Sequence, residues 1–137
     1  MQPLVLDTCA LVALVEGEPM RTSAIAAIEA AQDAQVLFVP SFVALELAQK
    51  MAVGKLVLGK TGARTWFAHA ARSFGLTEVP MSANMALAAY ELPEPFHKDP
   101  ADRLIVAVAR LLEAPVVTVD RRLLAYARQG HVQVLAY

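Results

Sequence analysis

Short runs of consecutive apolar residues alternate along the chain with longer segments of mixed polarity. Each run has the length of a buried strand, and most of them are followed at once by a proline or an aspartate. The predicted strands cover residues 4–6, 36–39, 76–79, 116–119 and 132–135. Segments with helical signals separate these strands, which predicts a parallel sheet with helices on both faces. We therefore expect an α/β fold in one domain spanning residues 1–137.

Residues that favour helix starts precede several of the longer segments. Pro19 is suited to the first turn of a helix, Ser41 and Ser82 are suited to N-caps, and Asp99 stands before Pro100 in the order of an N-cap and first helical residue. The predicted helices cover about residues 10–15, 19–33, 42–52, 62–74, 83–90, 100–112 and 121–128.

Composition narrows the class of protein further. The 137 residues are 57% hydrophobic and 18% charged, which excludes a disordered chain and supplies a core without covalent staples. The single cysteine, Cys9, excludes an intramolecular disulfide, fits a reducing interior and is expected to be a small buried residue. No apolar stretch approaches the ~18 residues of a membrane span, and no signal peptide is evident. We expect a cytoplasmic protein without a membrane partner.

The net charge of −1 excludes nucleic-acid binding by bulk charge alone. The charges are nevertheless unevenly distributed. Before residue 50 the only basic residue is Arg21, against six acids, whereas six basic residues follow from Lys98 onward. This asymmetry is compatible with a basic rim beside an acidic centre.

Nearly all the aspartates occupy positions that would suit one shared acidic site. Asp7 and Asp120 stand at the carboxyl ends of predicted strands, where ligands bind in open parallel sheets. Asp99 and Asp102 lie one helical turn apart and share a face. Glu46 interrupts an otherwise apolar helix, where an uncompensated carboxylate is costly.

If these acids converge, their mutual repulsion favours protonation unless a cation keeps them ionised. Carboxylate ligands without Cys or His favour Mg²⁺ or Mn²⁺ over zinc. Such an ion polarises a phosphate and activates water, so the set of acids indicates phosphoryl chemistry.

Each acid also has a structural explanation that the sequence leaves open. Helix capping explains three of them: Asp7, Asp99 and Asp120. Asp102 would fall in the first turn of its helix, where a carboxylate complements the helix dipole. Glu46 could form a surface ion pair with Lys50, four residues later.

Four sequence motifs carry a resemblance to a known family. Asp7-Thr8 follows the first predicted strand, and Glu46 is followed by residues 54–56 (GKL). Residues 97–105 (HKDPADRLI) form the most specific motif, and residues 117–121 (VTVDR) end the series. In order and spacing these motifs resemble the PIN domain, the nuclease fold of VapC-type toxins. Alanine at position 101 departs from the bulkier aromatic residue associated with that place.

The resemblance implies an acidic quartet of Asp7, Glu46, Asp102 and Asp120. Asp7 and Asp102 would be the principal ligands of Mg²⁺ or Mn²⁺, and Asp99 would be auxiliary. The implied activity is that of a metal-dependent endoribonuclease, the toxin of a type II toxin–antitoxin pair. A small antitoxin and a homodimer are the implied protein partners, and single-stranded RNA is the expected substrate.

Neighbouring residues have two explanations each. Thr8 is either an auxiliary group of the site or a helix cap. Thr118 is either an auxiliary group of the site or an ordinary strand residue. His97 is either a proton-transfer group or a loop histidine. Three arginines beside the acids are expected to hold RNA phosphates, with a solvated helix face as the alternative: Arg103, Arg121 and Arg122.

Two other classes of function compete with the nuclease. A phosphoaspartyl enzyme or switch would use Asp7, but the haloacid-dehalogenase type needs a second aspartate where Cys9 stands. A non-catalytic interaction module would keep the same fold without turnover, although the presence of all four acids argues against it. A dinucleotide-binding domain is disfavoured because no glycine-rich phosphate loop follows the first strand.

Overall fold

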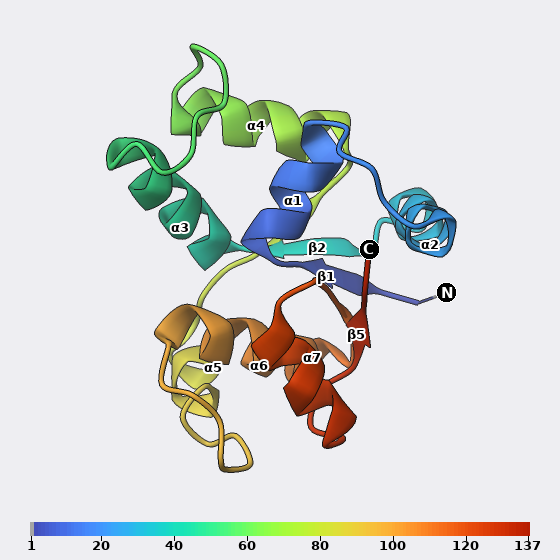
Figure 1. The fold of residues 1–137 in the computed structure, drawn as a ribbon, viewed down its shortest axis with the longest axis vertical. Helices are drawn as coiled ribbons and strands as arrows, with labels where there is room; N and C mark the ends of the chain where they lie inside the picture. Colours follow the sequence, from blue (N-terminus) through green and yellow to red (C-terminus); the bar gives the residue numbers. More distant parts are fainter. Residues whose placement is uncertain (1) are drawn as a thin grey trace.

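A computed structural model describes residues 2–137, in which strands and helices alternate along the chain (Figure 1). The strands are β1 (Leu4–Leu6), β2 (Leu37–Pro40), β3 (Thr77–Val79), β4 (Val116–Val117) and β5 (Val134–Leu135). The helices are α1 (Thr8–Val15), α2 (Thr22–Asp33), α3 (Ser41–Ala52), α4 (Ala63–Ser73), α5 (Ala83–Ala88), α6 (Pro100–Leu112) and α7 (Arg121–Arg128).

The strands form one parallel sheet in the order β3-β2-β1-β4-β5. Helices α1, α3 and α4 lie on one side of the sheet, and α5, α6 and α7 lie on the other (Figure 1). Parallel neighbours need crossover connections, and these helices supply them. The predicted α/β fold, a parallel sheet between two helical layers, is confirmed.

The core explains why the strands read as continuous apolar runs. The three residues of β1 are fully buried because helices cover both faces of the central strand. The most apolar surface of α6 is also internal, and Val106 and Val108 are fully buried. In residues 2–137 no helix combines the length and the apolarity needed to cross a membrane.

The last two strands are shorter than predicted. The expected strand 116–119 ends at Val117, and the expected strand 132–135 is reduced to its last two residues. Thr118 still donates its N–H to the carbonyl of Leu135, but its hydroxyl accepts the N–H of Asp120 at 3.0 Å. This local hydrogen bond turns the chain out of the sheet and into α7.

Three helix starts also differ from the predictions. Helix α1 begins at Thr8, because Asp7 caps it. Helix α2 begins at Thr22 and not at Pro19, which lies in the connection that follows α1. Ser41 is the first residue of α3 and not its N-cap; its hydroxyl accepts the backbone N–H of Met81 at 3.0 Å, across the connection that follows β3.

Helix α3 offers a matched test of this packing. Leu47 is fully buried and Leu45 is 70% exposed, although the two leucines share one helix. We predict that Leu47→Ala lowers the free energy of unfolding by about 2–5 kcal/mol, because it removes buried methyl groups and leaves a cavity. Leu45→Ala is the control and should change it by less than about 0.5 kcal/mol. Equal losses in urea denaturation would contradict this orientation of α3.

Candidate functional site

The carboxyl ends of β1 and β4 lie side by side at the centre of the sheet. Leu6 pairs with Val117, and the N–H of Asp7 points to the carbonyl of Val117 at 3.5 Å. The strand order reverses at this place, because β2 and β3 lie on one side of β1 whereas β4 and β5 lie on the other. Open parallel sheets bind ligands at such reversals.

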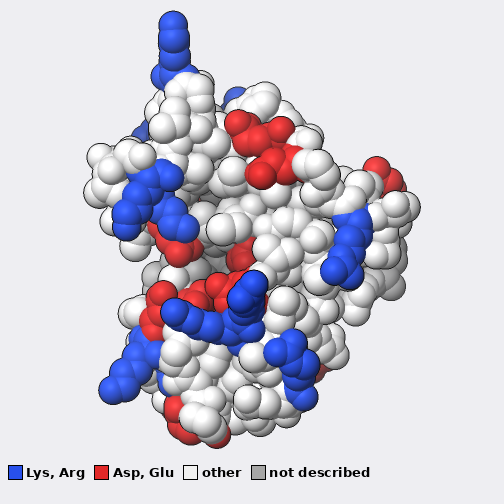
Figure 2. Space-filling model, viewed as in Figure 1, with Lys and Arg blue, Asp and Glu red and all other residues white. Residues whose placement is uncertain are grey.

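A cleft of about 580 Å³ opens at this reversal. It is lined by side chains from four separate parts of the chain: Asp7, Thr8, Cys9, Glu46, Lys50, Asp99, Asp102, Val119, Asp120, Arg121 and Arg122. Figure 2 shows acidic atoms within a hollow of the surface and basic side chains on both sides of it. The structure therefore brings all four carboxylates of the expected quartet to one cleft.

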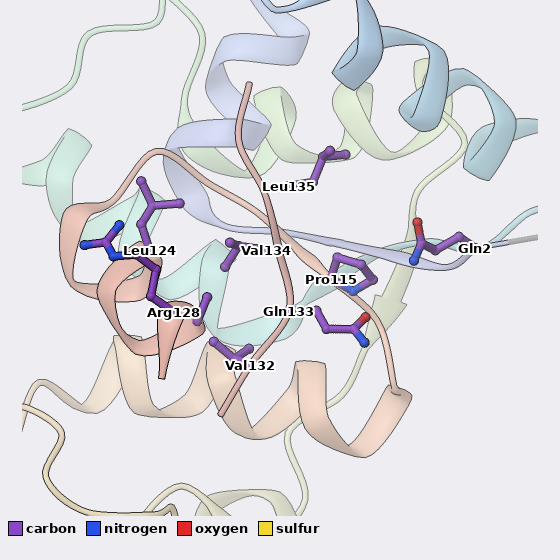
Figure 3. Close-up of a pocket in the computed structure, with 9 residues that line it drawn as sticks. Gln2, Pro115, Leu124, Arg128, Val132, Gln133, Val134 and Leu135 are labelled. Carbon is purple, nitrogen blue, oxygen red and sulfur yellow. The ribbon is translucent and has the colours of Figure 1, made fainter. Parts of the chain in front are cut away.

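A larger hollow of about 680 Å³ lies beside β5 and α7 (Figure 3). Its walls are mainly aliphatic, and Arg128 is the one ionisable residue among those that line it. It contains no carboxylate and no pair of polar groups suited to acid–base work. The smaller acidic cleft is therefore the candidate site.

Three of the acids are held in place by the helix starts they cap. Oδ1 of Asp7 accepts the N–H of Ala10 at 2.8 Å, and Oδ1 of Asp120 accepts the N–H of Arg122 at 2.9 Å. Asp99 caps α6 in the same way. The capping explanation is thus correct for all three, but each bond uses only Oδ1. Capping and participation in the cleft are compatible.

Glu46 reaches the cleft from the middle of α3. Its Oε1 accepts a hydrogen bond from the hydroxyl of Thr8, which is 5% exposed. Within residues 2–137 Glu46 forms no ion pair with Lys50, so the alternative explanation of Glu46 as half of a surface ion pair does not hold. Thr8 therefore orients an acid of the cleft instead of capping α1.

The pKa of Asp102 is raised from its ordinary value of 3.8 to about 7, and burial is the largest cause. The negative charges of Asp120, Asp99 and Glu46 contribute to this rise, in that order. Arg122 acts in the opposite direction. Without a cation in the cleft, Asp102 is therefore about half protonated near neutral pH.

Asp7 experiences the same forces. Burial is the main cause that raises its pKa, and the charges of Asp120 and Glu46 add to the effect. Hydrogen bonds from Thr118 and from the N–H of Ala10 oppose it. Thr118 is fully buried directly after β4, and its side chain contacts Asp7 of the cleft.

These carboxylates fit a hard divalent cation better than they fit an empty cleft. A cation would offset both the burial and the repulsion that hold protons on Asp7 and Asp102. In the described part of the chain, no three acidic, histidine or cysteine side chains lie close enough to hold one ion together. A divalent cation bound here would therefore be held by one or two carboxylates and would keep several waters.

The arginines near the acids separate into two groups. Arg121 and Arg122 are exposed and line the cleft, as expected. Arg103 is only 4% exposed and points inward, where it donates to the carboxylate of Glu94 and to three backbone carbonyls. The structure contradicts the phosphate-binding role expected of Arg103, because its donors are used inside the protein.

Two residues of the cleft were missed or misplaced by sequence reasoning. Cys9 is exposed in the cleft and not buried as expected. Lys50 lines the wall formed by α3, opposite the arginines of α7. The spacing of Lys50 from Glu46 could have indicated this, since residues four apart share one helix face.

A parallel α/β domain with an acidic cleft at the reversal of its strand order belongs to the class of α/β domains that bind their ligands at such reversals. Comparison with protein families narrows this class to one. Residues 4–129 match the PIN domain, and the chain belongs to the PIN domain family. PIN domains are generally nucleases.

Solved structures with the same fold include two complexes. One is VapBC2 from Rickettsia felis bound to a DNA fragment from their promoter, with 18% sequence identity and a TM-score of 0.68. The match covers 98% of each chain. The other is FitAB bound to the IR36 DNA fragment, with 15% identity, a TM-score of 0.63, and coverage of 97% of this chain and 94% of that one. No curated protein matches the sequence.

The raised pKa of Asp102 predicts how stability depends on pH in metal-free protein. Between about pH 4 and pH 7 the folded state retains a proton that the unfolded state has released. The free energy of unfolding should therefore decrease as pH rises through this window. Asp102→Asn should remove on the order of 1–2 kcal/mol of that decrease, a value reduced by the partial exposure of the carboxyl group.

Urea denaturation in EDTA at pH 4 to 8 measures this effect. Asp33→Asn is the matched control, because Asp33 is exposed at the end of α2 and does not line the cleft. The control should follow the wild-type curve. Parallel curves for Asp102→Asn and wild type would show that Asp102 titrates normally.

Proposed function

We propose that the protein is a divalent-metal-dependent endoribonuclease that hydrolyses phosphodiester bonds of RNA. The observation that carries this proposal is the gathering of Asp7, Glu46, Asp102 and Asp120 in one cleft. The raised pKa values of Asp7 and Asp102 are typical of carboxylates arranged for a cation. Membership of the PIN domain family supports the same class of reaction.

Asp7 and Asp102 are the proposed principal ligands of Mg²⁺, with Mn²⁺ as a substitute. Both are partly buried, and they face the cleft from different segments. When bound, the ion polarises the phosphate and lowers the pKa of attacking water. Asp120 and Glu46 complete the acidic wall, and the hydroxyl of Thr8 fixes the carboxylate of Glu46.

The basic residues around the acids would hold the nucleic-acid backbone. Arg121 and Arg122 lie on one wall of the cleft and Lys50 lies on the other, so phosphates on both sides of the scissile bond can be bound. Such a grip aligns the attacking water and the leaving oxygen. A flexible single strand reaches this in-line geometry more easily than a rigid duplex does.

The biological role proposed is that of the toxin in a type II toxin–antitoxin pair. The fold it shares with VapBC2 and FitAB supports this role, and a small antitoxin is the protein partner it requires. We also propose a cytoplasmic homodimer. Sedimentation equilibrium should then give twice the 14.7 kDa of one chain, and a mass of one chain would contradict the dimer.

RNA cleavage tests the catalytic proposal directly. Asp7→Asn and Asp102→Asn should each reduce Mg²⁺-dependent cleavage of a labelled single-stranded RNA by about 10²-fold or more, since small errors in the position of reacting groups have effects of this size. Asparagine at position 7 can still cap α1, so the loss of cleavage by Asp7→Asn would not reflect an uncapped helix. EDTA should abolish wild-type cleavage.

The same Asp33→Asn variant controls for the loss of a charge far from the cleft, and it should cleave RNA like the wild type. Undiminished cleavage by the Asp7 and Asp102 variants would refute the proposed site. A wild-type protein that binds no Mn²⁺ in calorimetry would indicate a non-catalytic interaction module. A mass increase of one phosphoryl group after incubation with acetyl phosphate would indicate a phosphoaspartyl enzyme.

A further inference from the structure

His97 lies beside the acidic cleft, in contact with a proposed metal ligand and a proposed phosphate-binding residue. Its Nε2 is 3.0 Å from Oδ2 of Asp102, and its Nδ1 is 3.4 Å from Nη1 of Arg122. The side chain is 22% exposed and belongs to the connection between α5 and α6. One imidazole thus touches residues from two helices, α6 and α7.

The groups around Nδ1 determine which nitrogen carries the proton. The backbone N–H of Asp99 donates to Nδ1 at 3.4 Å, and the guanidinium of Arg122 has only donors to offer. Nδ1 is therefore an acceptor, which places the proton of the neutral ring on Nε2. Among residues 2–137 this buried Nε2 has no regular hydrogen bond, and the polar atom beside it is Oδ2 of Asp102.

The connection that carries His97 is anchored from inside the protein. Nε of Arg103 donates to the carbonyl of His97 at 2.9 Å, and its Nη2 donates to the carbonyl of Phe96 at 2.9 Å. The hydroxyl of Tyr126 holds the carbonyl of Pro93 at 2.5 Å, and its ring stacks on Phe96 at 4.1 Å. These contacts fix the backbone, so the imidazole is held in a defined position against Asp102 and Arg122.

We propose that His97 is a positioning residue that aligns the carboxylate of Asp102 for the metal and the guanidinium of Arg122 for phosphate; this role rests on the proposed function. The N–H at Nε2 faces Oδ2 at 3.0 Å and leaves Oδ1 for the cation. The lone pair at Nδ1 holds one nitrogen of Arg122 and leaves its other donors for substrate. The ring also stands between two opposite charges whose direct pairing would occupy both groups.

Two substitutions separate the two halves of this role. Glutamine places an amide N–H where Nε2 lies, so His97→Gln keeps the donor to Asp102. Asparagine places an amide oxygen where Nδ1 lies, so His97→Asn keeps the acceptor for Arg122. His69→Gln is the matched control, because His69 is exposed on α4 and contacts the hydroxyl of Ser73, outside the cleft.

Calorimetry with Mn²⁺ and steady-state cleavage of single-stranded RNA at saturating Mn²⁺ measure the two halves. His97→Asn should bind Mn²⁺ about 10–100-fold more weakly than wild type, as is usual when a group that orients a metal ligand is lost. Its KM for RNA should stay near the wild-type value. His97→Gln should show the reverse, with wild-type Mn²⁺ affinity and a KM raised several-fold.

Each other outcome is decisive. Unchanged Mn²⁺ affinity and unchanged KM in both variants would overturn the positioning role alone. Equal losses of Mn²⁺ affinity and RNA cleavage in both variants, together with a lowered melting temperature, would also overturn it, because they would show that His97 is only a structural residue. A wild-type protein that neither binds Mn²⁺ nor cleaves RNA would overturn the proposed function instead. Imidazole ¹⁵N shifts of metal-free wild type give a readout independent of metal and RNA: a proton on Nε2 is expected, and one on Nδ1 would overturn the role.

Discussion

The pairing of β1 with β4 is the contact on which the arrangement of the site depends. It joins the first strand of the chain to a strand more than a hundred residues later, and it sets the carboxyl ends of both at the same edge. Asp7 and Asp120 come together for this reason. Helices on the two sides of the sheet then bring Glu46 and Asp102 to the same cleft. Crowding of like charges follows directly from this topology.

Much of the fold could be predicted because the physical signals are local. A parallel strand covered on both faces must be apolar throughout, which is why Leu4, Val5 and Leu6 indicated a strand. The acids could be grouped for a related reason, since the ends of parallel strands meet at one edge. Asp7 and Asp120 were therefore placed together from sequence, and the cleft contains them both.

The remaining features depend on contacts between distant residues, which no local signal reveals. Arg103 stands beside Asp102 in sequence, yet its side chain turns inward to carbonyls of the preceding connection. Ser41 has the chemistry of an N-cap, but a backbone N–H after β3 competes successfully for its hydroxyl. Cys9 is small and apolar enough for the core, and only the position of the cleft explains its exposure.

Each capping carboxylate uses Oδ1 to hold a helix start, and under the proposed nuclease function this has an evolutionary consequence. A lineage that abandoned hydrolysis would still gain from Asp, Asn, Ser or Thr at positions 7, 99 and 120, because the helix starts need an acceptor whatever the domain does. Glu46 and Asp102 cap nothing, and the burial of Asp102 is costly. Genetic drift should therefore erase these two acids first, which makes them the better markers of retained activity among descendants of this fold.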